Sequence, residues 1–282
     1  MRENKELPFS LPSKLTTWLD IFILGMYEKN TSNVMIIDGK SGKGKSTLAF
    51  QCAKYIDSDF GLHKIHYDPH EFLSSTKGKV GLAQAKQGDC LVFDEALLLS
   101  NRSTMSAINK MIVASMSMIR SKNLTIIFCV NSIFDLDKNL AIFRSDLVLH
   151  VYGNEGHFDR GKFLAFFKGN DGQDRIKTLY LLGKKYYDYG KPRCNFNSKF
   201  SKYFVVDEKE YEAQKQIGIN AFLNNPETKG RMEKKYRERF MQSLVIFRTK
   251  CNFTIEQLAE LLNTSRGNID KWILELKEEG RL

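Results

Sequence analysis

The sequence predicts an α/β protein with a mainly parallel sheet that is covered by helices on both faces. Three observations support this fold class. Short, uninterrupted apolar runs recur along the chain, and segments with apolar residues every three or four positions alternate with them. A glycine-rich loop also follows the first of the runs. The runs occupy residues 33–37, 89–96, 124–132, 147–153 and 162–169.

The remaining elements follow from the same patterns, taken in chain order. Helices are expected at 14–28, 48–56, 71–75, 80–87 and 103–122, a strand at 64–68, and a short helix or turn at 140–146. The segment 170–225 has a mixed pattern that favours no structure. Turn and breaker residues at 224–230 suggest a hinge, and the chain beyond it is helical and basic. We therefore expect an N-terminal helical extension (1–29), a main domain (30–225) and a small all-α domain (226–282).

Composition narrows the possible functions. The 282 residues carry 43 Lys and Arg against 33 Asp and Glu, a formal charge of +10, which makes a polyanionic partner such as nucleic acid plausible. A basic protein without such a partner would have the same balance. The five cysteines are scattered, which argues against a zinc site or a disulfide framework and favours a reducing, cytoplasmic location. We expect neither a transmembrane helix nor a signal peptide.

The glycine-rich loop matches the phosphate-binding pattern G-x-x-x-x-G-K-[ST]. An apolar strand enters it and a helix leaves it, as the pattern requires. Glycines let backbone N–H groups surround phosphate oxygens, Lys45 would reach the β- and γ-phosphates, and the Ser46 hydroxyl would ligate Mg²⁺. The residues expected to contact ATP are Gly39, Ser41, Gly42, Lys43, Gly44, Lys45, Ser46 and Thr47.

Two acidic residues end the apolar run 89–96. Asp94 would hold Mg²⁺ through water, and Glu95 would act as general base toward the attacking water. The alternative is that the pair only caps the next helix. Asn131 ends another apolar run and could sense the γ-phosphate, although it could equally be a simple strand terminator. Arg120 and Arg144 are candidate arginine fingers that reach a neighbouring subunit, and Arg120 could instead complement the carboxyl end of its own helix.

Read together, DGKSGKGKST, CLVFDEA and MIRSKNLTIIFCVNSIFDLDKNLAIFRSDLVLHV resemble the additional-strand P-loop ATPases. Among these ATPases, the three stretches resemble the FtsK/HerA superfamily of DNA-pumping motors. That superfamily includes zonula-occludens-toxin-like and packaging ATPases of phages and mobile elements. The resemblance covers about residues 30–155. It implies a RecA-like core with strand order 5-1-4-3-2 and a ring, often hexameric, with ATP sites between subunits. Arg120, Asn131 and Arg144 match the superfamily's order of arginine, polar sensor and arginine, but the sensor there is usually glutamine.

The last thirty residues or so, 253–282, resemble a helix-turn-helix unit. Asn263 would occupy the tight turn and Ser265 would cap the second helix. The residues expected to contact DNA are Arg266, Asn268 and Lys271 on the second helix and Lys234, Lys235 and Arg237 on the preceding one. A small helical module that binds another protein remains the alternative.

These features lead to two hypotheses of different class. The first is a Mg²⁺-dependent ATPase that assembles on double-stranded DNA as a homo-oligomer, in the hexameric ring that the resemblance implies. It translocates or packages DNA for a virus, plasmid or other mobile element. It would act in the cytoplasm, or in the host cytosol if viral or plasmid-encoded. The second is an ATP-dependent DNA-binding switch that recruits a replication or transposition partner. A membrane-linked role, implied by the toxin-like resemblance, is less favoured.

Overall fold

The computed structural model of the chain describes residues 7–73, 78–94, 119–153, 161–169, 171–223 and 226–282. It divides into two compact units, one ending at Ile219 and one beginning at Asn220. This division lies a few residues before the boundary predicted at 225. Because α6 crosses it, the pattern of breaker residues did not reveal where the first unit ends.

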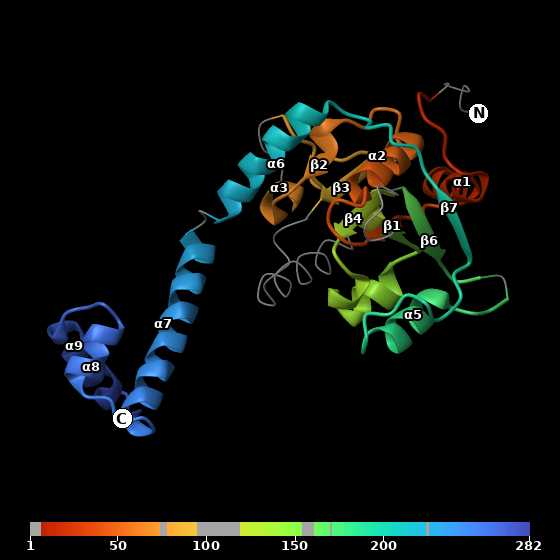
Figure 1. Cartoon of the computed structure of the whole chain (residues 1–282). Helices are drawn as coiled ribbons and strands as arrows, with labels where there is room; N and C mark the ends of the chain where they lie inside the picture. The colour runs from red at the N-terminus through yellow and green to blue at the C-terminus, as the bar shows by residue number, and fades with distance from the viewer. Residues whose placement is uncertain (1–6, 74–77, 95–118, 154–160, 170, 224–225) are drawn as a thin grey trace. The chain divides into compact units, whose positions relative to one another are not determined.

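The first unit is an α/β structure (Figure 1). In chain order its elements are α1 (Ser13–Glu28), β1 (Asn33–Asp38), α2 (Lys45–Ile56), η1 (Leu62–Lys64), β2 (Ile65–His66), α3 (Pro69–Leu73), β3 (Cys90–Asp94), β4 (Thr125–Val130), η3 (Ile133–Asp135), the π-helical turn η4 (Asn139–Arg144), β5 (Leu147–Tyr152), β6 (Lys162–Phe166), α5 (Arg175–Gly183), β7 (Phe196–Lys199) and α6 (Glu208–Leu223).

The described strands form one sheet in the order β2-β3-β4-β1-β5-β6-β7. Strands β1 to β5 run parallel to one another, whereas β6 pairs antiparallel with both β5 and β7. The sheet therefore differs from the predicted order 5-1-4-3-2. That sequence of strands occurs within it, but β6 and β7 extend the sheet beyond β5. Strand β6 returns antiparallel beside β5, a pairing that needs no crossover helix, and β7 adds to the outer edge of β6 after α5.

Two apolar cores cover the two faces of the sheet. Successive residues of β1 belong to opposite cores, since Val34 and Ile36 pack in one and Met35 and Ile37 in the other. Side chains of α3, η3, η4 and α5 complete the first core, and α1 and α2 complete the second. Every residue of β1 is buried, as expected for a central strand of a parallel sheet. The helix predicted at 14–28 is thus part of the main unit's core.

Several predicted elements differ from the structure. Residues 80–87 form turns and not a helix. Their backbone is held by neighbouring segments, because the N–H of Val80 donates to the carbonyl of His63 and that of Leu82 to the carbonyl of Phe72. The predicted hinge at 224–230 is also wrong from Pro226 onward, since α7 begins there, and proline suits the first turn of a helix. Of the helix predicted at 103–122, residues 103–118 lie outside the described residues.

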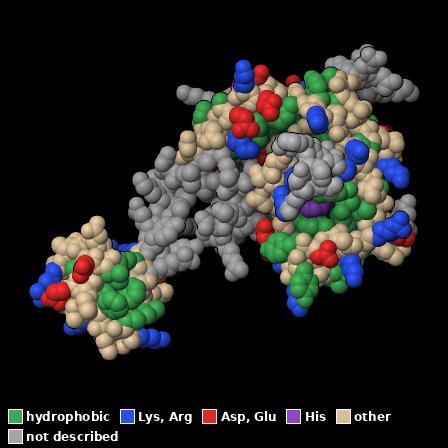
Figure 2. Space-filling view, viewed as in Figure 1, with side chains coloured by type: hydrophobic (Ala, Val, Ile, Leu, Met, Phe, Trp, Pro, Cys, Tyr) green, Lys and Arg blue, Asp and Glu red, His purple; other side chains and the backbone are tan. Residues whose placement is uncertain are grey.

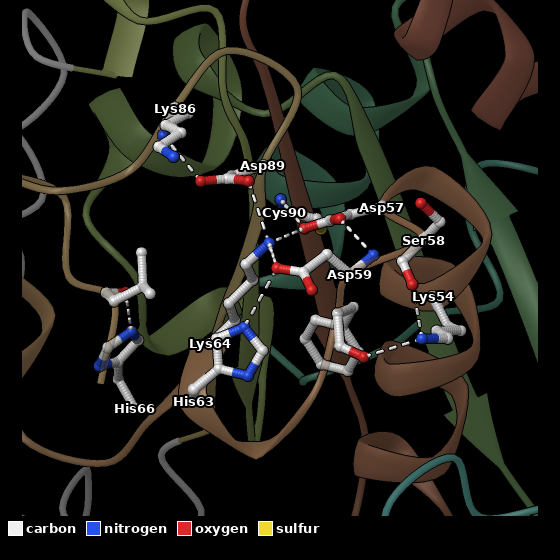
Figure 3. Close-up of polar contacts among 12 residues, drawn as sticks. Lys54, Asp57, Ser58, Asp59, His63, Lys64, His66, Lys86, Asp89 and Cys90 are labelled. Carbon is white, nitrogen blue, oxygen red and sulfur yellow. Dashed lines mark hydrogen bonds and ion pairs between the residues drawn. The ribbon is translucent and has the colours of Figure 1, made fainter. Parts of the chain in front are cut away.

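A buried lysine ties together three segments near the amino-terminal ends of β2 and β3 (Figure 3). Lys64 Nζ contacts Asp57 Oδ2 at 2.7 Å, Asp89 Oδ1 at 3.0 Å and Asp59 Oδ2 at 3.1 Å. Its side chain is 2% exposed. Burial alone opposes the positive charge, but the hydrogen bonds to Asp57 and Asp89 outweigh it and raise the pKa of Lys64. This cluster fixes the edge of the sheet opposite to the glycine-rich loop.

The second unit is helical. It contains α7 (Pro226–Thr249), α8 (Ile255–Leu261) and α9 (Arg266–Glu278). Its core consists of Met241, Leu244, Leu258, Ile269, Ile273 and Leu276. Thr254 begins α8 with a capping box to Gln257, and Ser265 caps α9 by accepting a hydrogen bond from the N–H of Asn268. Between the helices Asn263 has φ 46°, a left-handed conformation that asparagine tolerates.

None of the helices in the described part of the chain combines the length and the hydropathy needed to cross a membrane.

Candidate functional site

A glycine-rich loop joins the end of β1 to the start of α2. Gly39, Gly42 and Gly44 have φ values of 139°, 74° and 100°, a backbone region that favours glycine. At Gly39 a Cβ atom would lie 2.1 Å from the backbone oxygen of Val151 on β5. Glycine therefore lets the loop approach β5 closely at this position, and a side chain there would meet the backbone of β5.

The amino end of α2 lacks a side-chain cap. Gly44 occupies the N-cap position and has no side chain that could accept from the first N–H groups of the helix. Those donors, together with the positive end of the helix dipole, favour an anion at this point. The first turn of α2 contains no acidic residue that would neutralise this potential.

Lys45 lies at the base of the loop and is 5% exposed. Its Nζ donates to the carbonyl of Gly39 at 2.6 Å and to Asn131 Oδ1 at 3.3 Å. Burial lowers the pKa of Lys45, although the charges of Asp94 and Asp38 act in the other direction. The predicted phosphate-contacting lysine and the predicted sensor therefore lie within hydrogen-bond distance of each other.

Ser46 and Asp94 come together at the carboxyl-terminal edge of the sheet. Ser46 Oγ donates to Asp94 Oδ2 at 2.9 Å, although the two residues are 48 positions apart. Asp94 ends β3 beside Cys129 of β4, and Asp38 ends β1 beside Val130. Parallel strands thus deliver these carboxylates to one edge, which is where open α/β sheets bind their ligands.

This pair has the chemistry of a Mg²⁺ site. Magnesium prefers oxygen ligands and usually binds through one or two carboxylates, a hydroxyl and phosphate oxygens. Asp94 is 2% exposed, and its Oδ1 atom is buried without a hydrogen-bond partner among the described residues. A buried carboxylate oxygen without a partner is costly, so a cation with its water shell fits this position. Ser46 and Asp94 are the residues that would hold it.

A second buried carboxylate, that of Asp38, lies at the end of β1 where the loop begins. Asp38 is fully buried and accepts hydrogen bonds from the N–H of Ile133 at 2.8 Å, from His150 Nδ1 at 3.0 Å and from the hydroxyl of Tyr189. The rings of His150 and Tyr189 stack with their centroids 3.5 Å apart. Asp38 therefore connects the start of the loop to the segment that follows Asn131. This network around Asp38 could not be predicted from the sequence, because the residues that form it are far apart in the chain.

Helix α6 brings two further side chains to the pair formed by Ser46 and Asp94. Tyr211 OH donates to Asp94 Oδ2 at 2.6 Å and lies 3.2 Å from Ser46 Oγ. Lys215 Nζ donates to the Tyr211 hydroxyl at 2.9 Å and lies 3.8 Å from Asp94 Oδ2. Both residues lie in the segment for which no structure was predicted. The one available signal was their spacing of four residues, which puts them on one face of a helix.

The chain between β7 and α6 crosses α2. Gln51 of α2 is fully buried, and its Nε2 donates to the carbonyls of Ser201 at 2.9 Å and Tyr203 at 2.7 Å. The ring of Phe200 lies against the loop, 3.1 Å from where a Cβ on Gly44 would be. These contacts hold the segment that leads into α6 against the amino-terminal part of α2.

The other predicted catalytic residues have different locations. Glu95 lies outside the described residues. Arg120 and Arg144 are exposed and precede β4 and β5, so they are near the amino-terminal edge of the sheet, away from the loop. The structure does not bring either arginine to the site of its own chain. Their action on a neighbouring subunit stays a prediction.

The predicted DNA-contacting residues of α9 are all exposed. Arg266 forms an ion pair with Glu256 at 3.0 Å, and Asn268 Nδ2 donates to Thr264 Oγ1 at 3.0 Å. Lys271 is exposed on the same helix. On α7, Arg237 pairs with Glu275 at 2.6 Å, whereas the side chains of Lys234 and Lys235 lie outside the described residues.

On the side seen in Figure 2, the first unit carries charged side chains of both signs. Its visible Lys and Arg side chains are spread singly among acidic and hydrophobic ones. The described side chains of this face therefore form no continuous basic stripe of the kind that follows a nucleic-acid backbone.

Three solved structures are similar to the chain. The N-terminal domain of zonular occludens toxin from Neisseria meningitidis is 13% identical, with 64% of this chain and 98% of that one covered and a TM-score of 0.34. The VirB11 ATPase of the Brucella suis type IV secretion system, in complex with sulphate, is 14% identical, with 60% and 56% covered and a TM-score of 0.33. The replication initiator DnaA bound to AMPPCP and single-stranded DNA is 13% identical, with 96% and 90% covered and a TM-score of 0.33. No protein-family model and no curated protein matches the chain. All three likenesses are distant, and the function proposed below rests on the residues of the site.

Proposed function

We propose that the protein is a Mg²⁺-dependent ATPase. The observation that carries this proposal is the hydrogen bond between Ser46 Oγ and Asp94 Oδ2, which joins the glycine-rich loop to the carboxylate at the end of β3. A chance basic loop would have no reason to meet a buried carboxylate that has an oxygen without a hydrogen-bond partner among the described residues. A glycine-rich loop, a lysine, a hydroxyl and a carboxylate are together the groups that bind a nucleoside triphosphate and its Mg²⁺ ion.

The chain's own residues have distinct tasks in this proposal. The backbone of the loop and the amino end of α2 bind the phosphates, and Lys45 exchanges its contact with the Gly39 carbonyl for phosphate oxygens. When bound by Ser46 and Asp94, Mg²⁺ would neutralise phosphate charge. Asn131, 3.3 Å from Lys45 Nζ, is within reach of the same region and would orient water there. Glu95 is the proposed general base.

We further propose that the second unit binds double-stranded DNA as a helix-turn-helix. The short turn at Asn263, the cap at Ser265 and the exposed side chains of Arg266, Asn268 and Lys271 support this role. Arg266 must exchange its ion pair with Glu256 for contacts with DNA, so part of its contribution is offset. Lys234, Lys235 and Arg237 of α7 would contact phosphates.

On this basis the protein is proposed to assemble on DNA as a hexameric ring and to translocate or package DNA for a virus, plasmid or other mobile element. Arg120 or Arg144 would act in the ATP site of a neighbouring subunit. Their exposed positions away from their own site agree with an action in trans. The location proposed for this work is the cytoplasm, or the host cytosol.

The test is ATP turnover measured with and without duplex DNA. Duplex DNA is expected to raise the rate, and Glu95→Gln to lower it by at least about a hundredfold, because general-base catalysis contributes that much. Lys271→Gln should reduce the stimulation by DNA and leave the basal rate unchanged. Turnover that ignores DNA, or that survives in Glu95→Gln, contradicts the proposal.

A second candidate is a switch in which ATP binding orders a DNA-bound assembly without movement. The observation that favours it is α6. This helix contacts the proposed metal site through Tyr211 and ends at Leu223, three positions before α7 begins at Pro226. Displacement of a triplex-forming strand along duplex DNA separates the candidates. A motor displaces the strand in an ATP-dependent manner, whereas a switch binds DNA in response to ATP and leaves the strand in place.

A further inference from the structure

Three donors from two helices converge on one carboxylate oxygen. Asp94 Oδ2 accepts from Ser46 Oγ at 2.9 Å and from Tyr211 OH at 2.6 Å, and Lys215 Nζ lies 3.8 Å away. Ser46 belongs to the glycine-rich loop, whereas Tyr211 and Lys215 belong to α6. The phenol oxygen is thus within hydrogen-bond distance of both groups that would hold Mg²⁺.

This arrangement competes with a metal ion. Magnesium requires near-octahedral oxygen ligands and keeps several waters in its shell. That shell cannot form between Ser46 and Asp94 while a phenol hydroxyl bonds to both of them. The ammonium group of Lys215 adds a positive charge to the same oxygen, which compensates Asp94 without a metal and repels a second cation.

Tyr211 is built into this position and not merely resting on the surface. Its side chain is buried, and its ring packs against Phe50 at 5.3 Å and Phe204 at 5.2 Å between centroids. The ring is therefore held where its hydroxyl reaches the carboxylate, and a phenol hydroxyl beside a carboxylate is the hydrogen-bond donor.

The fit of α6 is nevertheless incomplete. Asp94 Oδ1 and the hydroxyl of Tyr67, whose ring centroid is 6.1 Å from that of Tyr211, are both buried without a hydrogen-bond partner among the described residues. Unpaired buried polar groups disfavour the arrangement that contains them. A helix whose polar contacts leave such groups unpaired is suited to shift when a stronger ligand for Asp94 arrives.

We propose that α6 is a latch on the metal site: Tyr211 and Lys215 occupy Asp94 until Mg²⁺-nucleotide displaces them, and their release frees the helix that leads to the second unit. The inference rests on the proposed function and adds a regulatory device to it. By reciprocity of coupled equilibria, whatever loosens the latch must tighten Mg²⁺-nucleotide binding, and Mg²⁺-nucleotide must loosen α6.

The test uses the full chain, a fluorescent ADP analogue and two variants of the latch. Tyr211→Phe keeps the packed ring and removes the hydroxyl, and Lys215→Gln removes the charge. Lys209→Gln, an exposed position on the same helix, is the matched control. Affinity is measured by anisotropy with Mg²⁺ and with EDTA, and hydrogen exchange of residues 208–219 reports the seating of α6 without any catalysis.

Tyr211→Phe should bind the analogue about tenfold more tightly in Mg²⁺, the effect of one hydrogen bond to a charged group, and Lys215→Gln should also bind more tightly. With EDTA each variant should bind like wild type, and Lys209→Gln should do so throughout. In wild type, Mg²⁺ and the analogue should speed exchange in α6, and Tyr211→Phe should show fast exchange without them.

Distinct results would overturn the latch. Weaker binding by Lys215→Gln makes Lys215 a phosphate ligand, and unchanged affinity in Tyr211→Phe together with unchanged exchange in α6 means that the contact is structural. If neither wild type nor any variant binds the analogue, the proposed nucleotide site itself fails and the latch with it. Binding by wild type that the variants leave unchanged sinks the latch alone.

Discussion

Replacing Asp38 with leucine tests whether the buried carboxylate organises the base of the glycine-rich loop. The side chain is fully buried and accepts from Ile133 N–H, His150 Nδ1 and the Tyr189 hydroxyl. Tyr189 retains a contact with Ser132 Oγ at 3.0 Å, so the change leaves mainly Ile133 N–H and His150 Nδ1 without an acceptor. At about 1–3 kcal/mol for each of these two unpaired donors, the free energy of unfolding of the first unit should fall by about 2–6 kcal/mol.

The two tryptophans make the assay specific, because Trp18 lies in the first unit and Trp272 in the second. Urea unfolding followed by Trp18 fluorescence in a Trp272→Phe background reports the first unit alone. Asp20→Leu is the control, since Asp20 is exposed and accepts a hydrogen bond from the hydroxyl of Tyr55. A loss below about 1 kcal/mol in Asp38→Leu, no larger than in the control, would refute the reasoning. Asp38→Asn should cost less than Asp38→Leu, because the histidine tautomer can change to accept from the amide.

Three other predictions use the same fluorescence assay. Burial lowers the pKa of His66 to about 3 from 6.5, so the folded protein holds its neutral form while the unfolded chain takes up a proton below pH 6.5. As the pH falls below 6.5, wild type should therefore lose about 1.4 kcal/mol of stability per pH unit more than His66→Gln. Equal pH dependence of stability in the two proteins would contradict this. Lys64→Met should cost about 3–5 kcal/mol because Asp57, 7% exposed, keeps a buried charge; a neutral effect would mean that the cluster carries no stability. Gly39→Ala should lower the free energy of unfolding by about 2–5 kcal/mol, because its Cβ would lie 2.1 Å from a carbonyl oxygen. Gly42→Ala, whose Cβ would have nothing within 4 Å, should lower it by about 1 kcal/mol. Equal losses would show that the close approach at Gly39 is relieved elsewhere.

The parts of the site that could be predicted from the sequence are those encoded by local patterns. The loop from Gly39 to Ser46 has a fixed spacing, and Asp94 and Asn131 each follow an uninterrupted apolar run. Since parallel strands end at the same edge, their contacts with Lys45 and Ser46 follow from topology.

What escaped prediction depends on contacts between distant segments. Tyr211 and Ser46 are 165 residues apart, and no local period connects them. The turns at 80–87 mimic helical spacing because Leu82 and Ala85 are both buried in the same core, yet the N–H of Val80 bonds to His63 and not within a helix. At 80–87 tertiary contacts overrode the local preference, whereas the contact of Tyr211 with Ser46 has no local signal at all.

The most direct test of the central claim is ATP turnover in Mg²⁺ by wild type and Lys45→Ala. The buried ammonium of Lys45, 2.6 Å from the Gly39 carbonyl, is proposed to turn to the phosphates when ATP binds. Loss of such a charge contact should lower the rate by at least about a hundredfold, while circular dichroism of the variant stays that of the folded protein. Turnover by a folded Lys45→Ala at the wild-type rate, or no Mg²⁺-dependent turnover by wild type with or without DNA, would contradict the account.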